Sequence, residues 1–159
     1  MKVFGKTLGE YVKFQRPVLI VILAVGLLRL FTSLGGVSMG TARFFSMTVV
    51  VLLGVIYYGI SVPKTGFGTY RHLLPLVFIQ AALSNAIVIL GILIAIATGH
   101  DNIFTAPEFS PGMPGTGAFH IFGHVAFGTC IGSLIGWALS SLVMWITKKL
   151  TKRSPATAT

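Results

Sequence analysis

Four long apolar blocks dominate this sequence and constrain its fold more than any other feature. They cover residues 17–34, 44–62, 73–98 and 119–146. A helix of about 20 such residues crosses the hydrocarbon core of a bilayer. Only 9% of the 159 residues are charged, against roughly a quarter in a soluble domain. The sequence therefore predicts an all-α integral membrane protein: a four-transmembrane-helix bundle over residues 17–147, between a basic leader (1–16) and a basic tail (148–159).

The basic residues lie mainly beside or between the blocks, so the net charge of +9 is a topology signal and does not indicate nucleic acid binding. Four Lys or Arg lie in the leader, two in the connection 63–72 and four in the tail, which leaves Arg29 and Arg43. Cytoplasmic segments carry this excess, so both termini are expected in the cytoplasm of a multi-pass cell (inner) membrane protein. Cleavage of the first block as a signal peptide at Gly40-Thr41-Ala42 is the less favoured alternative, because Arg29 interrupts that block.

Arg29 is the one charged residue well inside an apolar block, in the half that faces away from the cytoplasm. An arginine at a helix centre costs about 3 kcal/mol to insert, which the Val, Leu, Ile and Phe residues of the block offset at roughly 0.4 kcal/mol each. Such a charge is a candidate contact to a lipid phosphate, an anionic ligand or an acidic outer loop. The simpler interpretation is that it reaches the outer headgroups. No carboxylate lies in any block, which disfavours proton-coupled transport.

His120 and His124 lie four residues apart, so a helix would place both imidazoles on one face. This spacing is compatible with zinc or with a tetrapyrrole such as haem or chlorin. Two ligands are not a complete site, and the outer connection offers further candidates in His100, Asp101 and Glu108. We expect hydrogen-bonding histidines and no cofactor, with haem, chlorin or zinc binding as the alternative.

The most specific pattern is a row of small residues, one every four positions along the fourth block: Gly128, Gly132, Gly136 and Ser140. Small residues let helix backbones approach closely in membranes. The row predicts a packing surface, either within the chain or against another subunit. In the third block Gln80 and Asn85 are expected to bond a neighbouring helix, with a ligand contact as the alternative.

No phosphate-binding loop, nucleophile elbow, H-E-x-x-H or C-x-x-C motif occurs, so the sequence does not predict an enzyme. The leading hypothesis is a structural or accessory subunit of a larger membrane complex, with membrane lipids and other transmembrane subunits, or further copies of itself, as partners. Two alternatives remain. One is a cofactor-binding protein that uses the histidine pair. The other is a small transporter or lipid-binding protein that works around Arg29 and Asn85.

Overall fold

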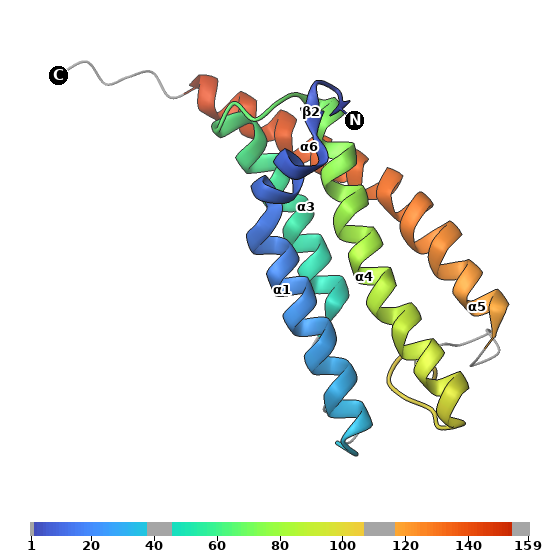
Figure 1. The fold of residues 1–159 in the computed structure, drawn as a ribbon. Helices are drawn as coiled ribbons and strands as arrows, with labels where there is room; N and C mark the ends of the chain where they lie inside the picture. Colours follow the sequence, from blue (N-terminus) through green and yellow to red (C-terminus); the bar gives the residue numbers. More distant parts are fainter. Residues whose placement is uncertain (1, 38–45, 107–116, 154–159) are drawn as a thin grey trace.

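The computed structural model describes residues 2–37, 46–106 and 117–153, and these form a helical bundle with a short hairpin at its start (Figure 1). The elements are β1 (Lys2–Val3), β2 (Lys6–Thr7), α1 (Leu8–Leu34), α3 (Met47–Lys64), α4 (Tyr70–Thr98), α5 (Ala118–Gly123), the π-helix η1 (His124–Ile131) and α6 (Gly132–Arg153). The last three join into one continuous helix. Four helices are thus long and apolar enough to cross a membrane, as expected of a multi-pass membrane protein.

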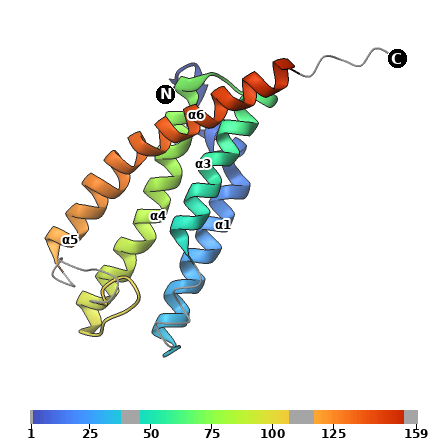
Figure 2. The same ribbon diagram turned by 180° about the vertical axis from the view of Figure 1, so that it is seen from behind.

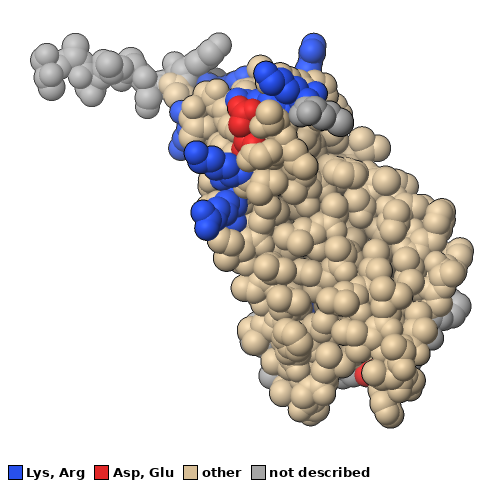
Figure 3. Space-filling view, in the orientation of Figure 1, with Lys and Arg blue, Asp and Glu red and all other residues tan. Residues whose placement is uncertain are grey.

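The two central helices, α3 and α4, separate α1 from the fourth helix. Helix α1 packs against α4 and α3, and α6 packs against the same two helices. Both termini lie at one end of the bundle, which we call the terminal end; the opposite end is the distal end (Figures 1 and 2). On the face drawn in Figure 3, the Lys and Arg side chains gather at the terminal end.

Helix α1 begins at Leu8, well before the predicted start at residue 17, so much of the predicted leader is folded. Thr7 and Glu10 form a capping box: the Thr7 backbone N–H donates to the Glu10 carboxylate at 2.8 Å, and the Glu10 N–H donates to the Thr7 hydroxyl. A capping box can start a helix in a segment that is not hydrophobic. The start predicted at residue 17 was based on hydropathy alone and therefore came too late. The predicted cleavage site 40–42, Arg43, the first residues of the second block and Glu108 lie outside the described residues.

The fourth helix was predicted as a regular α-helix, but its segment His124–Ile131 is π-helical. A π-helix bonds each residue to the fifth one along. Residues four apart therefore no longer keep the register that an α-helix gives them. This change bears directly on the predicted row of glycines.

The chain after α4 was expected to be an outer loop, yet residues Asn102–Ala106 are buried in the distal end of the bundle. The Asn102 side-chain amide donates to the Gly91 carbonyl at 2.7 Å, and its oxygen accepts from the Phe104 N–H at 3.0 Å. The Ile103 N–H donates to the Ser33 hydroxyl of α1 at 2.9 Å. Irregular backbone at membrane depth persists only where protein satisfies its polar groups, and these bonds do so.

Candidate functional site

A cavity of about 340 Å³ lies in the distal half of the bundle, between α1, α3, α4, η1 and the buried turn. Its polar lining comes from residues far apart in the sequence: Arg29, Thr48, Ser84, Asn85 and His124. Three of these, Arg29, Asn85 and His124 on three different helices, were singled out from the sequence, where one hypothesis already grouped Arg29 with Asn85. The fold brings them to one site.

Arg29 reaches this cavity from α1, and its guanidinium lies over the Phe104 ring, 5.5 Å from the ring centroid. Its Nε atom is buried and has no hydrogen-bond partner. The one ion pair that the described residues form joins Lys6 to Glu10 at the terminal end. Arg29 thus holds a positive charge in the cavity with no carboxylate paired to it in the described part of the chain.

Asn85 and the two histidines form a hydrogen-bonded chain along one wall. The Asn85 amide nitrogen donates to the Ala81 carbonyl at 2.9 Å, so its oxygen faces His124 Nδ1, also at 2.9 Å. His124 must therefore carry a proton on Nδ1, since the amide oxygen only accepts. Its Nε2 lies 3.3 Å from His120 Nε2, where a neutral His124 accepts from His120. This chain fixes the orientation of the imidazole in the cavity.

The histidine pair also has a geometry that a metal ion could use. The two Nε2 atoms are 3.3 Å apart, close to the spacing of about 3.3 Å that two nitrogens take on a tetrahedral zinc with bonds of about 2.0–2.1 Å. In the described part of the chain, no group of three His, Cys, Asp or Glu side chains surrounds a common point. His100 and Asp101 are exposed. The described residues thus supply two ligands for such an ion.

Gln80 lies outside this cavity and joins two helices. It is fully buried, and its amide nitrogen donates to the Val51 carbonyl of α3 at 3.2 Å. Its oxygen packs where a side chain on Gly54 would collide with it. Of the two interpretations, the structure favours contact with a neighbouring helix.

Three of the four residues in the predicted small-residue row pack closely within the chain, and the fourth, Gly132, does not. A Cβ on Gly136 would lie 2.7 Å from Val77, a Cβ on Gly128 would collide with Asn85, and the Ser140 hydroxyl donates to the Val55 carbonyl at 3.0 Å. Gly132, in contrast, has room for a Cβ, whose nearest neighbour would be the Phe127 carbonyl at 3.5 Å. The π-helical register before Gly132 accounts for this break.

Two residues at the cavity, Thr48 and Phe104, could not be predicted from the sequence, because neither belongs to a motif and Phe104 lies in a segment expected to be an outer loop. No known protein family, curated protein sequence or solved structure matches this chain. A function for this chain must therefore be inferred from its own residues.

Proposed function

We propose that this chain is a non-catalytic, multi-pass cell (inner) membrane protein that binds an oxyanion, a phosphate or carboxylate group, beside Arg29. The supporting observation is the buried Nε–H of Arg29 without a partner. An unpaired buried donor on a charged group is costly. A phosphate or carboxylate oxygen accepts from Nε–H while a second oxygen accepts from a terminal guanidinium N–H, and this bidentate, charge-assisted pair neutralises the buried charge.

The surrounding residues favour the same ligand. The hydroxyls of Thr48 and Ser84 line the cavity and can donate. The Phe104 ring against the guanidinium holds it in a fixed plane. The ligand is either the headgroup of a membrane lipid or a free anion, because both carry the same oxygens.

The binding test compares ligands by the thermal denaturation of the full chain in a neutral detergent. A ligand at about 100 times its Kd stabilises a protein by about 2.7 kcal/mol. We expect Arg29→Gln to abolish the stabilisation and Arg16→Gln, which removes an exposed arginine of the same helix, to preserve it. Inorganic phosphate, short-chain phosphatidylglycerol and short-chain diacylglycerol are compared. Stabilisation by both inorganic phosphate and phosphatidylglycerol indicates a free-anion site. Stabilisation by phosphatidylglycerol alone indicates a site for a lipid headgroup. If neither compound stabilises the protein, or if both stabilise Arg29→Gln as much as the parent, oxyanion binding is refuted.

The orientation we propose places both termini in the cytoplasm and the cavity in the outer half of the membrane. The supporting observation is the partition of Lys and Arg along the sequence. Reporters fused after Thr159 or inserted at Gly66 should therefore be active only in the cytoplasm. A reporter after Thr159 that is active only outside the cell would rule this orientation out.

A cofactor at the histidine pair is a second candidate, favoured by the 3.3 Å spacing of the two Nε2 atoms. Because the described residues supply only two ligands, we expect purified protein to be colourless and to contain little metal. Absorption spectra and elemental analysis check this expectation. Near-stoichiometric zinc, haem or chlorin that is lost in His120→Ala and His124→Ala would support the cofactor instead.

Membership of a larger complex remains a proposal drawn from the sequence. The small-residue row no longer supports it, because Gly128, Gly136 and Ser140 face α3 and α4 of the same chain. Blue-native gels of source membranes test it: a co-migrating complex would support an accessory subunit, and a free monomer would argue against one.

A further inference from the structure

The hairpin before α1 contains a residue that its turn does not favour. Val3 pairs with Lys6, which leaves a two-residue turn of Phe4 (φ 51°) and Gly5 (φ 88°). Turns with two positive φ values prefer Asn-Gly. A bulky residue at positive φ is an outlier, and such strain is often found at functional sites.

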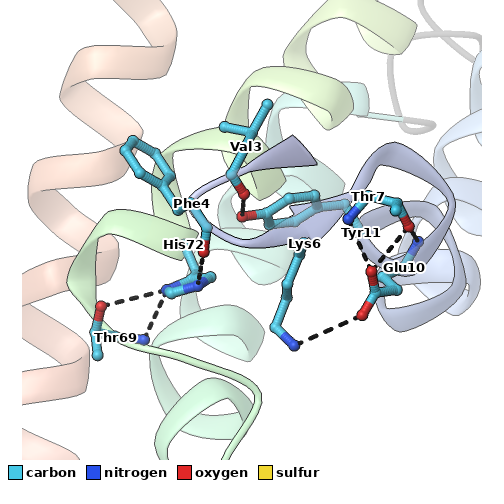
Figure 4. A network of polar contacts seen from close by, with 8 residues as sticks. All are labelled: Val3, Phe4, Lys6, Thr7, Glu10, Tyr11, Thr69 and His72. Carbon is cyan, nitrogen blue, oxygen red and sulfur yellow. Dashed lines mark hydrogen bonds and ion pairs between the residues drawn. The ribbon is translucent and has the colours of Figure 1, made fainter. Parts of the chain in front are cut away.

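Two side chains hold this hairpin in place, His72 from the start of α4 and Tyr11 from the start of α1, as Figure 4 shows. His72 Nδ1 accepts from the Thr69 N–H at 2.9 Å, so its Nε2–H is free to donate to the Phe4 carbonyl at 3.1 Å. The buried Tyr11 hydroxyl donates to the Val3 carbonyl at 3.0 Å. These bonds hold the backbone at Val3 and Phe4, and the Phe4 ring lies edge-on to the His72 ring with the two centroids 6.2 Å apart.

Phe4 stands at the junction of two neighbouring pockets. One is an apolar groove of about 590 Å³ between the hairpin, α4 and the η1–α6 junction, lined among others by Phe4, Leu8, Leu74, Phe78, Cys130 and Leu134. The other, of about 560 Å³, is lined by Phe4, Thr69, Tyr70, Arg71 and His72. Arg71 precedes Leu74 and Phe78 by about one and two turns of α4, so the charge lies at the terminal end of the groove.

Further basic and aromatic groups lie beside the second pocket. The Lys148 ammonium lies 4.6 Å from the centre of the Tyr70 ring, and the Trp137 indole N–H donates to the Tyr70 carbonyl at 2.8 Å. Glu10, at the start of α1, is engaged by Thr7 and Lys6. The pocket is therefore positive, with an aromatic rim of the kind found at headgroup depth.

We propose that these two pockets together bind one anionic phospholipid, with its phosphate beside Arg71 and one acyl chain in the groove past Phe4. A positive charge next to an apolar groove is complementary to such a lipid, and basic pockets between membrane helices bind anionic headgroups. The site is separate from the Arg29 cavity, which lies at the distal end. Its assignment to the cytoplasmic leaflet depends on the orientation proposed above; the binding itself does not.

The test is native mass spectrometry of the full chain carrying Arg29→Gln, so that the distal cavity contributes no binding. With phosphatidylglycerol we expect one lipid to stay bound at collision energies that remove phosphatidylcholine. Arg71→Gln should lower the fraction of protein that retains the lipid about tenfold. Arg16→Gln removes one positive charge from α1 and none from α4, and should leave this fraction unchanged. An equal loss in both variants would mean nonspecific attraction to basic residues and would overturn the site.

The Phe4→Asn variant tests whether Phe4 forms a wall of the groove or only shapes the turn of the hairpin. Asparagine tolerates positive φ, so the hairpin should persist, as slow hydrogen exchange of the paired backbone amides would report. Lipid retention should nevertheless fall several-fold, because the aromatic wall is gone. Retention equal to that of the parent, with the hairpin intact, would exclude Phe4 from the site.

Cross-linking locates the acyl chain. Phosphatidylglycerol with a diazirine in one chain should label the segments 74–79 and 130–134 in the parent and lose this labelling in Leu134→Trp, which fills the groove. Labelling spread evenly over the exposed faces of α1 and α3 would show an ordinary lipid annulus and refute the groove.

Discussion

Gly59→Ala is expected to lower the denaturation temperature of the detergent-solubilised protein by roughly 5–10 °C, since overpacking typically costs about 1–3 kcal/mol. An added Cβ would lie 2.7 Å from the Ser140 carbonyl oxygen and 2.6 Å from the Val143 Cβ of α6. One of these atoms is backbone and the other is attached to it, so no side-chain rotation relieves the contact. The two helices must move apart.

Separation of α3 and α6 also weakens their other contacts. The buried bond from the Ser140 hydroxyl to the Val55 carbonyl is 3.0 Å long, and membrane helices depend on such packing and bonding because lipid supplies no hydrophobic drive for association. Gly132→Ala is the matched control, since its Cβ has room and alanine favours helix. If both variants denatured at the same temperature, α3 and α6 would not pack as described.

This comparison also shows where sequence reasoning stopped. The four spans follow from hydropathy, because a bilayer requires long apolar helices, and the structure confirms four helices of that kind. The spacing of the small residues predicted one packing row that includes Gly132, whereas Gly132 has room for a Cβ and close approaches occur at Gly59 and Gly136. A π-helix cannot be recognised from the four-residue spacing, and it shifts every later side chain around the helix axis.

Three residues of the candidate site could be predicted from the sequence, and one hypothesis joined Arg29 to Asn85, but the addition of His124 and Phe104 to the same cavity could not be predicted. Arg29, Asn85 and His124 each stood out as polar groups within apolar blocks. Which of them meet depends on helix order and rotation, and hydropathy carries neither. The buried turn at 102–106 escaped prediction because its burial follows from hydrogen bonds to Gly91 and Ser33, which lie far away in the sequence.

Asn102→Ala is expected to release that turn from the bundle and to lower the denaturation temperature by an amount similar to that of Gly59→Ala. Asn102 is fully buried, and its side chain bonds both the Gly91 carbonyl and the Phe104 N–H. Without it, the two buried bonds to the Gly91 carbonyl and the Phe104 N–H are lost, at a cost of about 1–3 kcal/mol. Thermal denaturation and limited proteolysis measure the effect. Asp101→Ala, at the exposed neighbouring position, should be near neutral, and equal behaviour of the two variants would contradict the buried turn.

Release of the turn should also weaken oxyanion binding, although Asn102 itself does not line the cavity. Ile103 and Phe104 form one wall of the cavity, and the Phe104 ring lies against the Arg29 guanidinium. When that wall leaves, water reaches the guanidinium and competes with the ligand, so the phosphate-induced rise in denaturation temperature should shrink in Asn102→Ala. The reverse does not hold: Arg29→Gln removes the ligand contact but none of the bonds of Asn102, so proteolysis of the turn should stay slow. If Asn102→Ala released the turn yet bound phosphate as tightly as the parent, Phe104 would have no part in the site, and the ligand would have to reach Arg29 from another side of the cavity.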